Sequence, residues 1–234
     1  MTQLTPHFDD LDDGAPPMGL IVLETDETLE PDMTRYMSNR DNPVYVSRIA
    51  SGVEVTASNL KAMADRLGQT AGLLPKARPY PVVGYGCTSA SAQIGSEAIE
   101  EVIKTSCNAA YVTNPLRATV AHAADLGVSK FALVSPYIEE VNAKLREAFA
   151  NLGITTDVFG SFGVIRDDEV VRISQASVVE AAIKLGRDPN VEAVFLSCTN
   201  LRTYDAIPEI EAQIGKPTLS SNRSLSWDMI RHLA

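Results

Sequence analysis

Short apolar runs separated by helical patterns recur along the whole chain, and this alternation limits the fold more than any other feature. The runs lie at residues 18–23, 44–49, 82–84, 109–112, 131–134, 155–159, 193–196 and 218–219, each the length of a buried strand. Apolar residues at helical spacing predict helices within 60–71 and 138–149. The repeated order strand, loop, helix predicts an α/β fold with parallel sheets. A (β/α)8 barrel is the main alternative.

Two dipeptides mark expected helix starts. Asn114-Pro115 and Ser135-Pro136 each follow an apolar run, so that a capping side chain precedes a proline. Asparagine and serine are preferred helix caps, and proline is favoured at the first helical position. We therefore expect a helix to begin at each of these prolines.

Two segments of the chain resemble each other. At 82–90 and at 194–201, an apolar run ends in a small residue and continues as cysteine, threonine and polar residues, with Cys87 and Cys198 about half the chain apart. This repeat predicts two pseudo-symmetric α/β halves rather than a barrel. Because ligands bind at the carboxyl ends of strands in open α/β sheets, we expect both cysteines to line a cleft between the halves.

The expected division of the chain follows from this repeat. Residues 1–17 form a flexible acidic lead, residues 18–114 the first half with Cys87, and residues 115–234 the second half with Cys198. We also expect the C-terminal helix to cross back to the first half.

Composition excludes several classes of function. The formal charge of −10, with no clustered basic face, argues against nucleic-acid binding. The sequence contains neither a membrane-spanning apolar run nor a secretory signal, which predicts a cytoplasmic protein without membrane association. Three cysteines and three histidines show no metal-ligand spacing, so we expect free thiols and no metal.

The paired cysteines are the candidate catalytic residues. A single buried cysteine is often only a small apolar side chain, and we interpret Cys107 in that way. A thiol beside the amides at a helix start has a lowered pKa, and it can then act as a base, an acid or a nucleophile. We expect this environment for Cys87 and Cys198.

The polar residues after each cysteine are candidates for substrate binding. Thr88, Ser89, Thr199 and Asn200 can offer hydroxyls, an amide and backbone N–H groups to a carboxylate. Plain helix capping is the alternative role for such residues.

Several segments together resemble the aspartate/glutamate racemase superfamily. They are Gly-Leu-Ile-Val-Leu-Glu-Thr-Asp-Glu-Thr-Leu-Glu-Pro at 19–31, Tyr-Gly-Cys-Thr-Ser-Ala at 85–90, Thr-Asn-Pro at 113–115, Ser-Pro-Tyr at 135–137, Ser-Phe-Gly at 161–163 and Ser-Cys-Thr-Asn-Leu at 197–201. The chain is most similar to the branch of maleate cis-trans isomerase, arylmalonate decarboxylase and the ectoine-utilisation protein A, and among these to the last.

This resemblance implies a cofactor-independent enzyme that works between two halves. In the racemases, one cysteine removes a proton beside a carboxylate and the other returns one from the opposite face. In maleate isomerase a cysteine adds to the double bond, whereas the decarboxylase has a glycine in place of the first cysteine. Because this chain has Cys87 as well as Cys198, the resemblance argues against simple decarboxylation.

Asp26 and Tyr137 complete the expected site. The resemblance implies that Tyr137 binds a substrate carboxylate, with packing as the alternative role. Asp26 stands where maleate isomerases have a neutral amide, and a carboxylate there raises the pKa of a nearby thiol and attracts an ammonium group. The alternative for Asp26 is a solvated loop acid.

We therefore expect a two-cysteine isomerase or racemase of a small carboxylate, such as an N-acetyl-diaminobutyrate from ectoine breakdown. The alternatives are maleate cis-trans isomerisation, decarboxylation of an arylmalonate and non-catalytic binding of a small molecule. The sequence is also compatible with a homo-oligomer.

Overall fold

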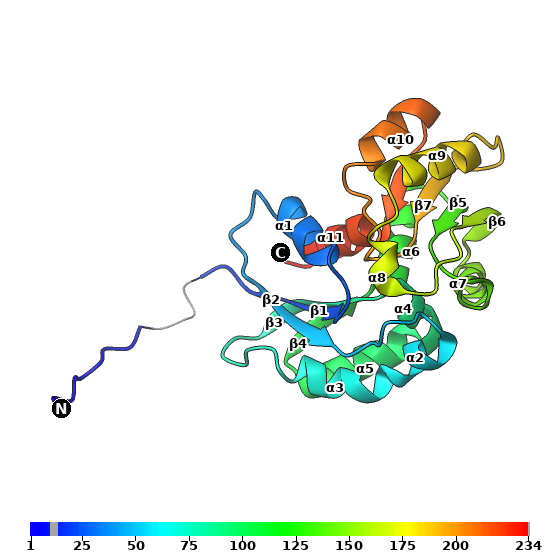
Figure 1. Ribbon diagram of the computed structural model, residues 1–234. Coiled ribbons are helices and arrows are strands. Elements are labelled where there is room, and N and C mark those ends of the chain that lie inside the picture. Colours follow the sequence, from blue (N-terminus) through cyan, green and yellow to red (C-terminus); the bar gives the residue numbers. More distant parts are fainter. Residues whose placement is uncertain (10–13, 234) are drawn as a thin grey trace.

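The computed structural model describes residues 1–9 and 14–233, and within them strands and helices alternate as predicted (Figure 1). The strands are β1 (Met18–Leu23), β2 (Val44–Ile49), β3 (Tyr80–Gly86), β4 (Ala109–Thr113), β5 (Lys130–Ser135), β6 (Thr155–Ser161), β7 (Ala193–Leu196) and β8 (Thr218–Ser220). The helices are α1 (Leu29–Tyr36), α2 (Ala57–Ala62), α3 (Ala64–Ala71), α4 (Thr88–Ile94), α5 (Ser96–Ser106), α6 (Pro115–Leu126), α7 (Glu139–Asn151), α8 (Asp167–Val170), α9 (Gln175–Gly186), α10 (Ile207–Ile214) and α11 (Ser221–Arg231).

The strands form two separate parallel sheets, which excludes the barrel. The first has the order β2-β1-β3-β4 and the second the order β6-β5-β7-β8. The two orders are the same when the strands of each half are counted from its start. The expected pseudo-symmetric α/β halves are therefore confirmed, and β3 and β7, which precede the two cysteines, occupy equivalent positions.

Burial explains why the central strands are almost wholly apolar. All six residues of β1 are buried, and so are the four residues of β7, because helices cover both faces of each sheet. One apolar core extends through both halves. A smaller cluster joins β1, α1 and α11, with Leu29 and Met229 among its members.

The last helix, α11, follows the second sheet but packs against elements that come earlier in the chain. It contacts α6, α1 and β3. The contact with β3 is close, since a Cβ atom added at Gly84 would lie 2.4 Å from the Met229 sulfur. The C-terminal segment thus connects the two halves.

Two details differ from the sequence predictions. The helix expected at 60–71 is divided into α2 and α3 at Met63, where the Arg66 N–H donates to the carbonyl three residues earlier. Ser135-Pro136 does not start a helix, and α7 begins only at Glu139. The Ser135 hydroxyl donates to the Asn142 side chain instead of capping a helix, and the Pro136 carbonyl accepts a hydrogen bond from the Val164 N–H. Asn114 does cap α6, where its side chain accepts from Arg117 N–H.

The acidic lead predicted at 1–17 includes residues 10–13, which lie outside the described residues; residues 1–9 are exposed and extend away from both halves (Figure 1). Among the helices in the described part of the chain, none has the length and apolar character needed to cross a membrane.

Candidate active site

A small buried cavity between the halves brings both predicted cysteines together. Its volume of about 20 Å³ is room for one water molecule. The first half contributes Leu23, Ser51, Gly52, Glu54, Val55, Leu60, Met63, Cys87, Thr88 and Ser89, and the second half contributes Tyr137, Asp167, Cys198 and Thr199. The cavity in this structure is therefore closed around its polar groups.

Cys87 is held at the junction of β3 and α4. The preceding Gly86 lets α1 approach, since a Cβ atom there would lie 2.2 Å from a Leu29 methyl carbon. Cys87 is the N-cap of α4, and its Sγ accepts the Ala90 N–H at 3.4 Å. The predicted position at a helix start is thus observed for this cysteine.

Cys198 has a strained backbone. Its φ of 102° makes it the one non-glycine residue with positive φ in the described chain. Its N–H donates to Ser221 Oγ at 3.0 Å, and the neighbouring Ser197 N–H donates to the Val134 carbonyl. Such strain costs on the order of 1–3 kcal/mol and is concentrated at functional sites. The expected helix start is wrong here, because residues 199–206 are not helical and α10 begins only at Ile207.

The prediction of lowered thiol pKa values is also wrong for this closed state. Burial raises the pKa of Cys87 to about 12, outweighing the Ala90 N–H that favours the thiolate. Burial also raises the pKa of Cys198 well above its usual range, and the Asp167 carboxylate adds to this effect. Both cysteines are therefore protonated at neutral pH in the closed cavity.

Three of the four predicted cradle residues line the cavity, namely Thr88, Ser89 and Thr199. Their hydroxyls have neighbours: Thr88 Oγ1 lies 2.7 Å from Ser221 Oγ, and Thr199 Oγ1 donates to the Gly86 carbonyl. Ser89 Oγ lies 3.6 Å from Cys87 Sγ. These residues therefore fix the two cysteine turns as well as lining the space beside them.

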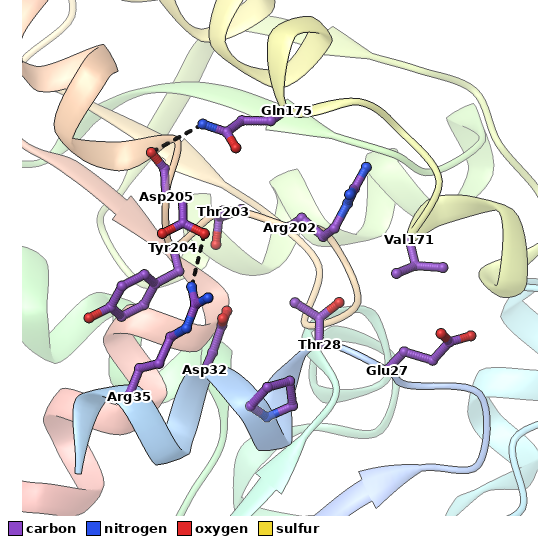
Figure 2. Close-up of a pocket in the computed structure, with 11 residues that line it drawn as sticks. Glu27, Thr28, Asp32, Arg35, Val171, Gln175, Arg202, Thr203, Tyr204 and Asp205 are labelled. Carbon is purple, nitrogen blue, oxygen red and sulfur yellow. Dashed lines mark hydrogen bonds and ion pairs between the residues drawn. The ribbon is translucent and has the colours of Figure 1, made fainter. Parts of the chain in front are cut away.

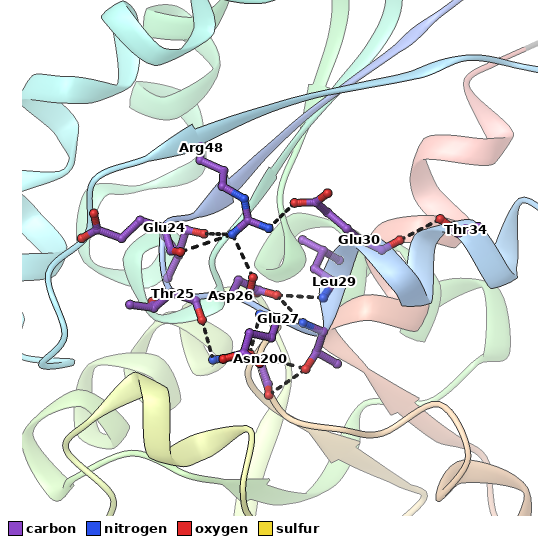
Figure 3. Close-up of polar contacts among 11 residues, drawn as sticks. Glu24, Thr25, Asp26, Glu27, Leu29, Glu30, Thr34, Arg48 and Asn200 are labelled. Atoms are coloured by element: carbon purple, nitrogen blue, oxygen red, sulfur yellow. Dashed lines mark hydrogen bonds and ion pairs between the residues drawn. The ribbon is translucent and has the colours of Figure 1, made fainter.

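Asn200 joins the two halves rather than facing the cavity. Its Oδ1 accepts the Glu27 N–H at 2.9 Å, and its Nδ2 donates to the Thr25 carbonyl (Figure 3). Nδ2 also donates to the Asp167 carbonyl at 3.0 Å. Thr28 Oγ1 also donates to the Asn200 carbonyl. These bonds engage both ends of the amide, so that Asn200 positions the loops around the site.

Tyr137 lines the cavity from the second half and is 2% exposed. Its carbonyl accepts hydrogen bonds from Asn142 Nδ2 and Ser161 Oγ, which fix the backbone. The Tyr137 side chain is near enough to Cys198 to lower the pKa of that thiol, which partly offsets the effect of burial. Burial raises the pKa of this tyrosine well above its usual range, so it remains a hydrogen-bond donor.

Asp26 is not a solvated loop acid, because it is 3% exposed. Its Oδ1 accepts the N–H groups of Thr28 at 2.9 Å and Leu29 at 2.8 Å, at the start of α1. Its Oδ2 has no hydrogen-bond partner among the described residues. Arg48 donates to the Asp26 carbonyl and pairs with Glu30, which holds this turn in place (Figure 3). Burial raises the pKa of the Asp26 carboxyl.

Sequence reasoning missed Asp167, the acid that lines the cavity itself. It is 2% exposed and accepts hydrogen bonds from Thr25 Oγ1 at 2.6 Å and Asn200 Nδ2 at 3.2 Å. Burial raises the pKa of its carboxyl. In the sequence it belongs to the acidic run Asp167, Asp168 and Glu169, which is typical of an exposed helix start, so no local signal singled it out.

A metal centre finds no support in the described part of the chain. No group of three or more His, Cys, Asp or Glu side chains is placed there to hold a metal ion. The groups assembled at the cavity are instead two thiols, a carboxyl, a phenol and hydroxyls, which suit proton transfer and covalent addition.

Known proteins share both this sequence pattern and this fold. Arylmalonate decarboxylase from Bordetella bronchiseptica is 33% identical over 121 residues, which cover 51% of this chain and 48% of that protein. A maleate isomerase from Geobacillus stearothermophilus is 26% identical over 231 residues, covering 92% of this chain and 91% of that protein. The crystal structure of a double variant of arylmalonate decarboxylase in its liganded form has a TM-score of 0.81, at 26% identity and with 94% and 93% of the two chains covered.

These relatives confirm the similarity to the branch that contains maleate isomerase and arylmalonate decarboxylase. The arylmalonate decarboxylase family matches residues 46–234, a segment that includes both cysteines, Tyr137 and Asp167. The chain therefore belongs to the arylmalonate decarboxylase family.

Proposed function

We propose that this protein is a cofactor-independent racemase or isomerase of a small carboxylate, with Cys87 and Cys198 as its two catalytic residues. The observation that carries the proposal is that equivalent strands of the two halves place one cysteine each at a single cavity. A substrate bound between them presents one face to each thiol. This is the arrangement that inversion at a carbon atom requires.

In the proposed reaction, one cysteine acts as thiolate and takes the proton from the carbon beside the substrate carboxylate. The electron pair left on that carbon is delocalised into the carboxylate, and the thiol of the other cysteine gives its proton to the opposite face. One C–H bond breaks and one forms, so the product is the mirror image, and the two cysteines have exchanged protonation states.

Because the pKa values of both thiols are raised, the reaction needs a base that removes the first thiol proton. A thiolate must form in the cavity, and Asp167 is the buried carboxylate that lines it. We propose that Asp167 takes the first thiol proton when the substrate enters. Its own raised pKa favours that role, because a carboxyl with a pKa closer to neutrality is a better proton acceptor.

The acidic surroundings narrow the class of substrate. Once Asp167 has taken the thiol proton and is neutral, Asp26 remains as a buried carboxylate near the site, close enough to raise the pKa values of both cysteines. Like charges disfavour a dianion such as maleate or a malonate, whereas an ammonium or amide group is accepted. We therefore propose an amino acid or an N-acylated amino acid; N-acetyl-diaminobutyrate fits this class.

Maleate cis-trans isomerisation is the second candidate. It is favoured by the maleate isomerase relative, which matches nearly the whole chain. In that reaction a thiolate adds to the double bond, rotation follows, and elimination releases the trans acid. Arylmalonate decarboxylation stays an alternative through the family match.

The experiment is to incubate the enzyme in deuterium oxide with three substrate sets: amino acids and N-acyl amino acids, maleate, and phenylmalonate. Deuterium incorporation at the α-carbon together with loss of optical activity is the expected result for the first set. Fumarate formation from maleate, or carbon dioxide release from phenylmalonate, without exchange in the first set would overturn the proposal and assign one of the alternatives.

Asp26→Asn tests the substrate class. Removing this charge should lower turnover of an ammonium-bearing substrate and improve binding of maleate, because the repulsion of a second carboxylate is weakened. The measurement is kcat/KM for both substrates at fixed ionic strength. Equal effects on the two substrates would show that Asp26 only caps α1.

A further inference from the structure

A second cavity lies on the other side of the junction formed by Asn200. It has a volume of about 250 Å³ and lies between α1, the end of α8 and the turns after β7 (Figure 2). It is lined by Glu27, Thr28, Pro31, Asp32, Arg35, Val171, Gln175, Arg202, Thr203, Tyr204 and Asp205. None of these residues lines the cysteine cavity. We call it the α1 pocket.

The residues that line the pocket include a nearly buried carboxylate, which has few hydrogen-bond partners within the protein. Asp32 is 5% exposed, and the described residues give its carboxylate one hydrogen bond, from Asn222 Nδ2 to Oδ2 at 2.8 Å. A carboxylate has about four acceptor sites. The remaining acceptor sites of this nearly buried carboxylate can therefore receive a cationic ligand in the pocket.

The charges around the pocket are of both signs and are separated in space. Glu27 and Asp32 lie on the α1 side, whereas Arg202 lies across from them on the turn after β7 (Figure 2). Arg35 pairs with Asp205 at 2.9 Å and packs over the Tyr204 ring. Within the described chain, Glu27 and Arg202 form no ion pair; Arg202 donates only to the Ile173 carbonyl.

We propose that the α1 pocket binds a small zwitterion, namely a free α-amino acid, with its ammonium group at Asp32 and its carboxylate at Arg202. This proposal does not depend on the reaction proposed for the cysteines.

The pocket is connected to the cysteine loop through one side chain. Asn222 Nδ2 donates both to Asp32 Oδ2 and, at 2.9 Å, to the carbonyl of Thr199, the residue after Cys198. A ligand that binds Asp32 therefore contacts a carboxylate whose hydrogen-bond donor is Asn222. The same Asn222 side chain also holds the turn that contains Cys198.

The test uses L-alanine as the probe, with ethylamine and propionate as analogues that lack the carboxylate or the ammonium group. Binding to the full chain is followed by amide chemical shifts at millimolar probe concentrations. We expect L-alanine to shift the amides of residues 27–35 and 202–205 and to bind more tightly than either analogue. Shifts absent from both segments, or an analogue that binds as tightly as alanine, would overturn the proposal.

Matched variants locate the site. Asp32→Asn should weaken alanine binding about tenfold or more, the loss expected for a charged hydrogen bond, whereas Asp125→Asn on the exposed face of α6 should leave it unchanged. Arg202→Gln should remove the preference for alanine over ethylamine. Cys87→Ser should retain binding at the α1 pocket. Equal weakening by Asp32→Asn and Asp125→Asn, or loss of binding in Cys87→Ser, would contradict the assignment.

Discussion

At the scale of single residues, the two cysteines differ in how the chain holds them. Cys87 caps a helix in an ordinary extended conformation, whereas Cys198 is held at φ 102° by its bond to Ser221. The same Ser221 hydroxyl lies 2.7 Å from Thr88 Oγ1, so one serine touches both cysteine turns. The relative placement of the two thiols therefore depends on residues that neither cysteine motif contains.

Replacing either thiol by a hydroxyl tests the two-base reaction. Cys87→Ser and Cys198→Ser should each lower turnover by several orders of magnitude, because an alcohol is a much weaker acid than a thiol and cannot supply the anion. Far-ultraviolet circular dichroism should show an unchanged fold. Turnover near the wild-type value in Cys87→Ser would reject the two-thiol reaction and favour a one-cysteine decarboxylase.

The raised thiol pKa values predict slow alkylation of the ligand-free enzyme. With a pKa of about 12, Cys87 at pH 8 has a thiolate fraction on the order of a thousandfold below that of a free cysteine. Its reaction with iodoacetamide should therefore be slow and should accelerate as pH rises toward 12. Peptide mass spectrometry assigns the modified site. Rapid labelling of Cys87 at pH 8 would show that the thiol is not in the environment described here.

Asp167→Asn should accelerate alkylation of Cys198. The Asp167 carboxylate raises the pKa of this thiol, so removing its charge lowers that pKa and increases the thiolate fraction at a fixed pH above neutrality. The matched control is Asp168→Asn, which changes the exposed neighbour that pairs with Arg166. An identical rate in the two variants would show that Asp167 does not act on Cys198.

At the scale of elements, a short contact between the halves covers the cysteine cavity. Glu54 and Arg166 form an isolated antiparallel bridge, in which Val55 N–H donates to the Ile165 carbonyl and Asp167 N–H to the Val53 carbonyl, both at 2.8 Å. Val55 and Asp167 also line the cavity. Because a space of about 20 Å³ does not admit a carboxylic acid, the cavity must widen for substrate to enter, and we expect this bridge to be the contact that separates.

A disulfide across the bridge tests that movement. Residues facing each other in a non-hydrogen-bonded antiparallel pair have Cα atoms about 4.5 Å apart, within the range that a disulfide accepts. The double variant Glu54→Cys, Arg166→Cys should lose turnover when oxidised and regain it on reduction. Each single variant serves as a control under the same oxidation. Full turnover in the oxidised double variant would show that substrate enters by another route.

At the scale of the whole molecule, α11 and the Asn200 junction connect the two halves. The apolar core is continuous through both, and α11 packs from the second half onto β3 of the first. We therefore expect both halves to unfold together in one cooperative transition.

Gly84→Ala tests this connection, because its added Cβ atom would lie 2.4 Å from the Met229 sulfur. Overpacking should lower the free energy of unfolding by about 1–3 kcal/mol while the transition stays single. In a double-mutant cycle, Gly84→Ala should cost less in the Met229→Ala background than in the wild type, because the clashing side chain is gone. Two separate transitions in chemical denaturation, or an equal cost of Gly84→Ala in both backgrounds, would contradict this account of α11.

The sequence by itself determined the elements and their arrangement in two halves. Each strand follows from local patterns, as do the starts of α4 at Cys87 and of α6 at Asn114. The Cys-Thr repeat located the two cysteines because equivalent turns need equivalent sequences. Tertiary structure decided the rest. Whether a carboxyl is buried depends on what packs over it, so neither Asp167 at the cavity nor Asp32 in the α1 pocket was recognisable locally.

The same reason explains the wrong predictions. The pKa of Cys87 depends on burial by both halves, which outweighs the helix start visible in the sequence. Ser135 does not cap a helix, because its hydroxyl donates to the side chain of Asn142 in α7. Local patterns fix hydrogen bonds within an element, whereas desolvation and contacts between distant segments arise only when the two halves come together.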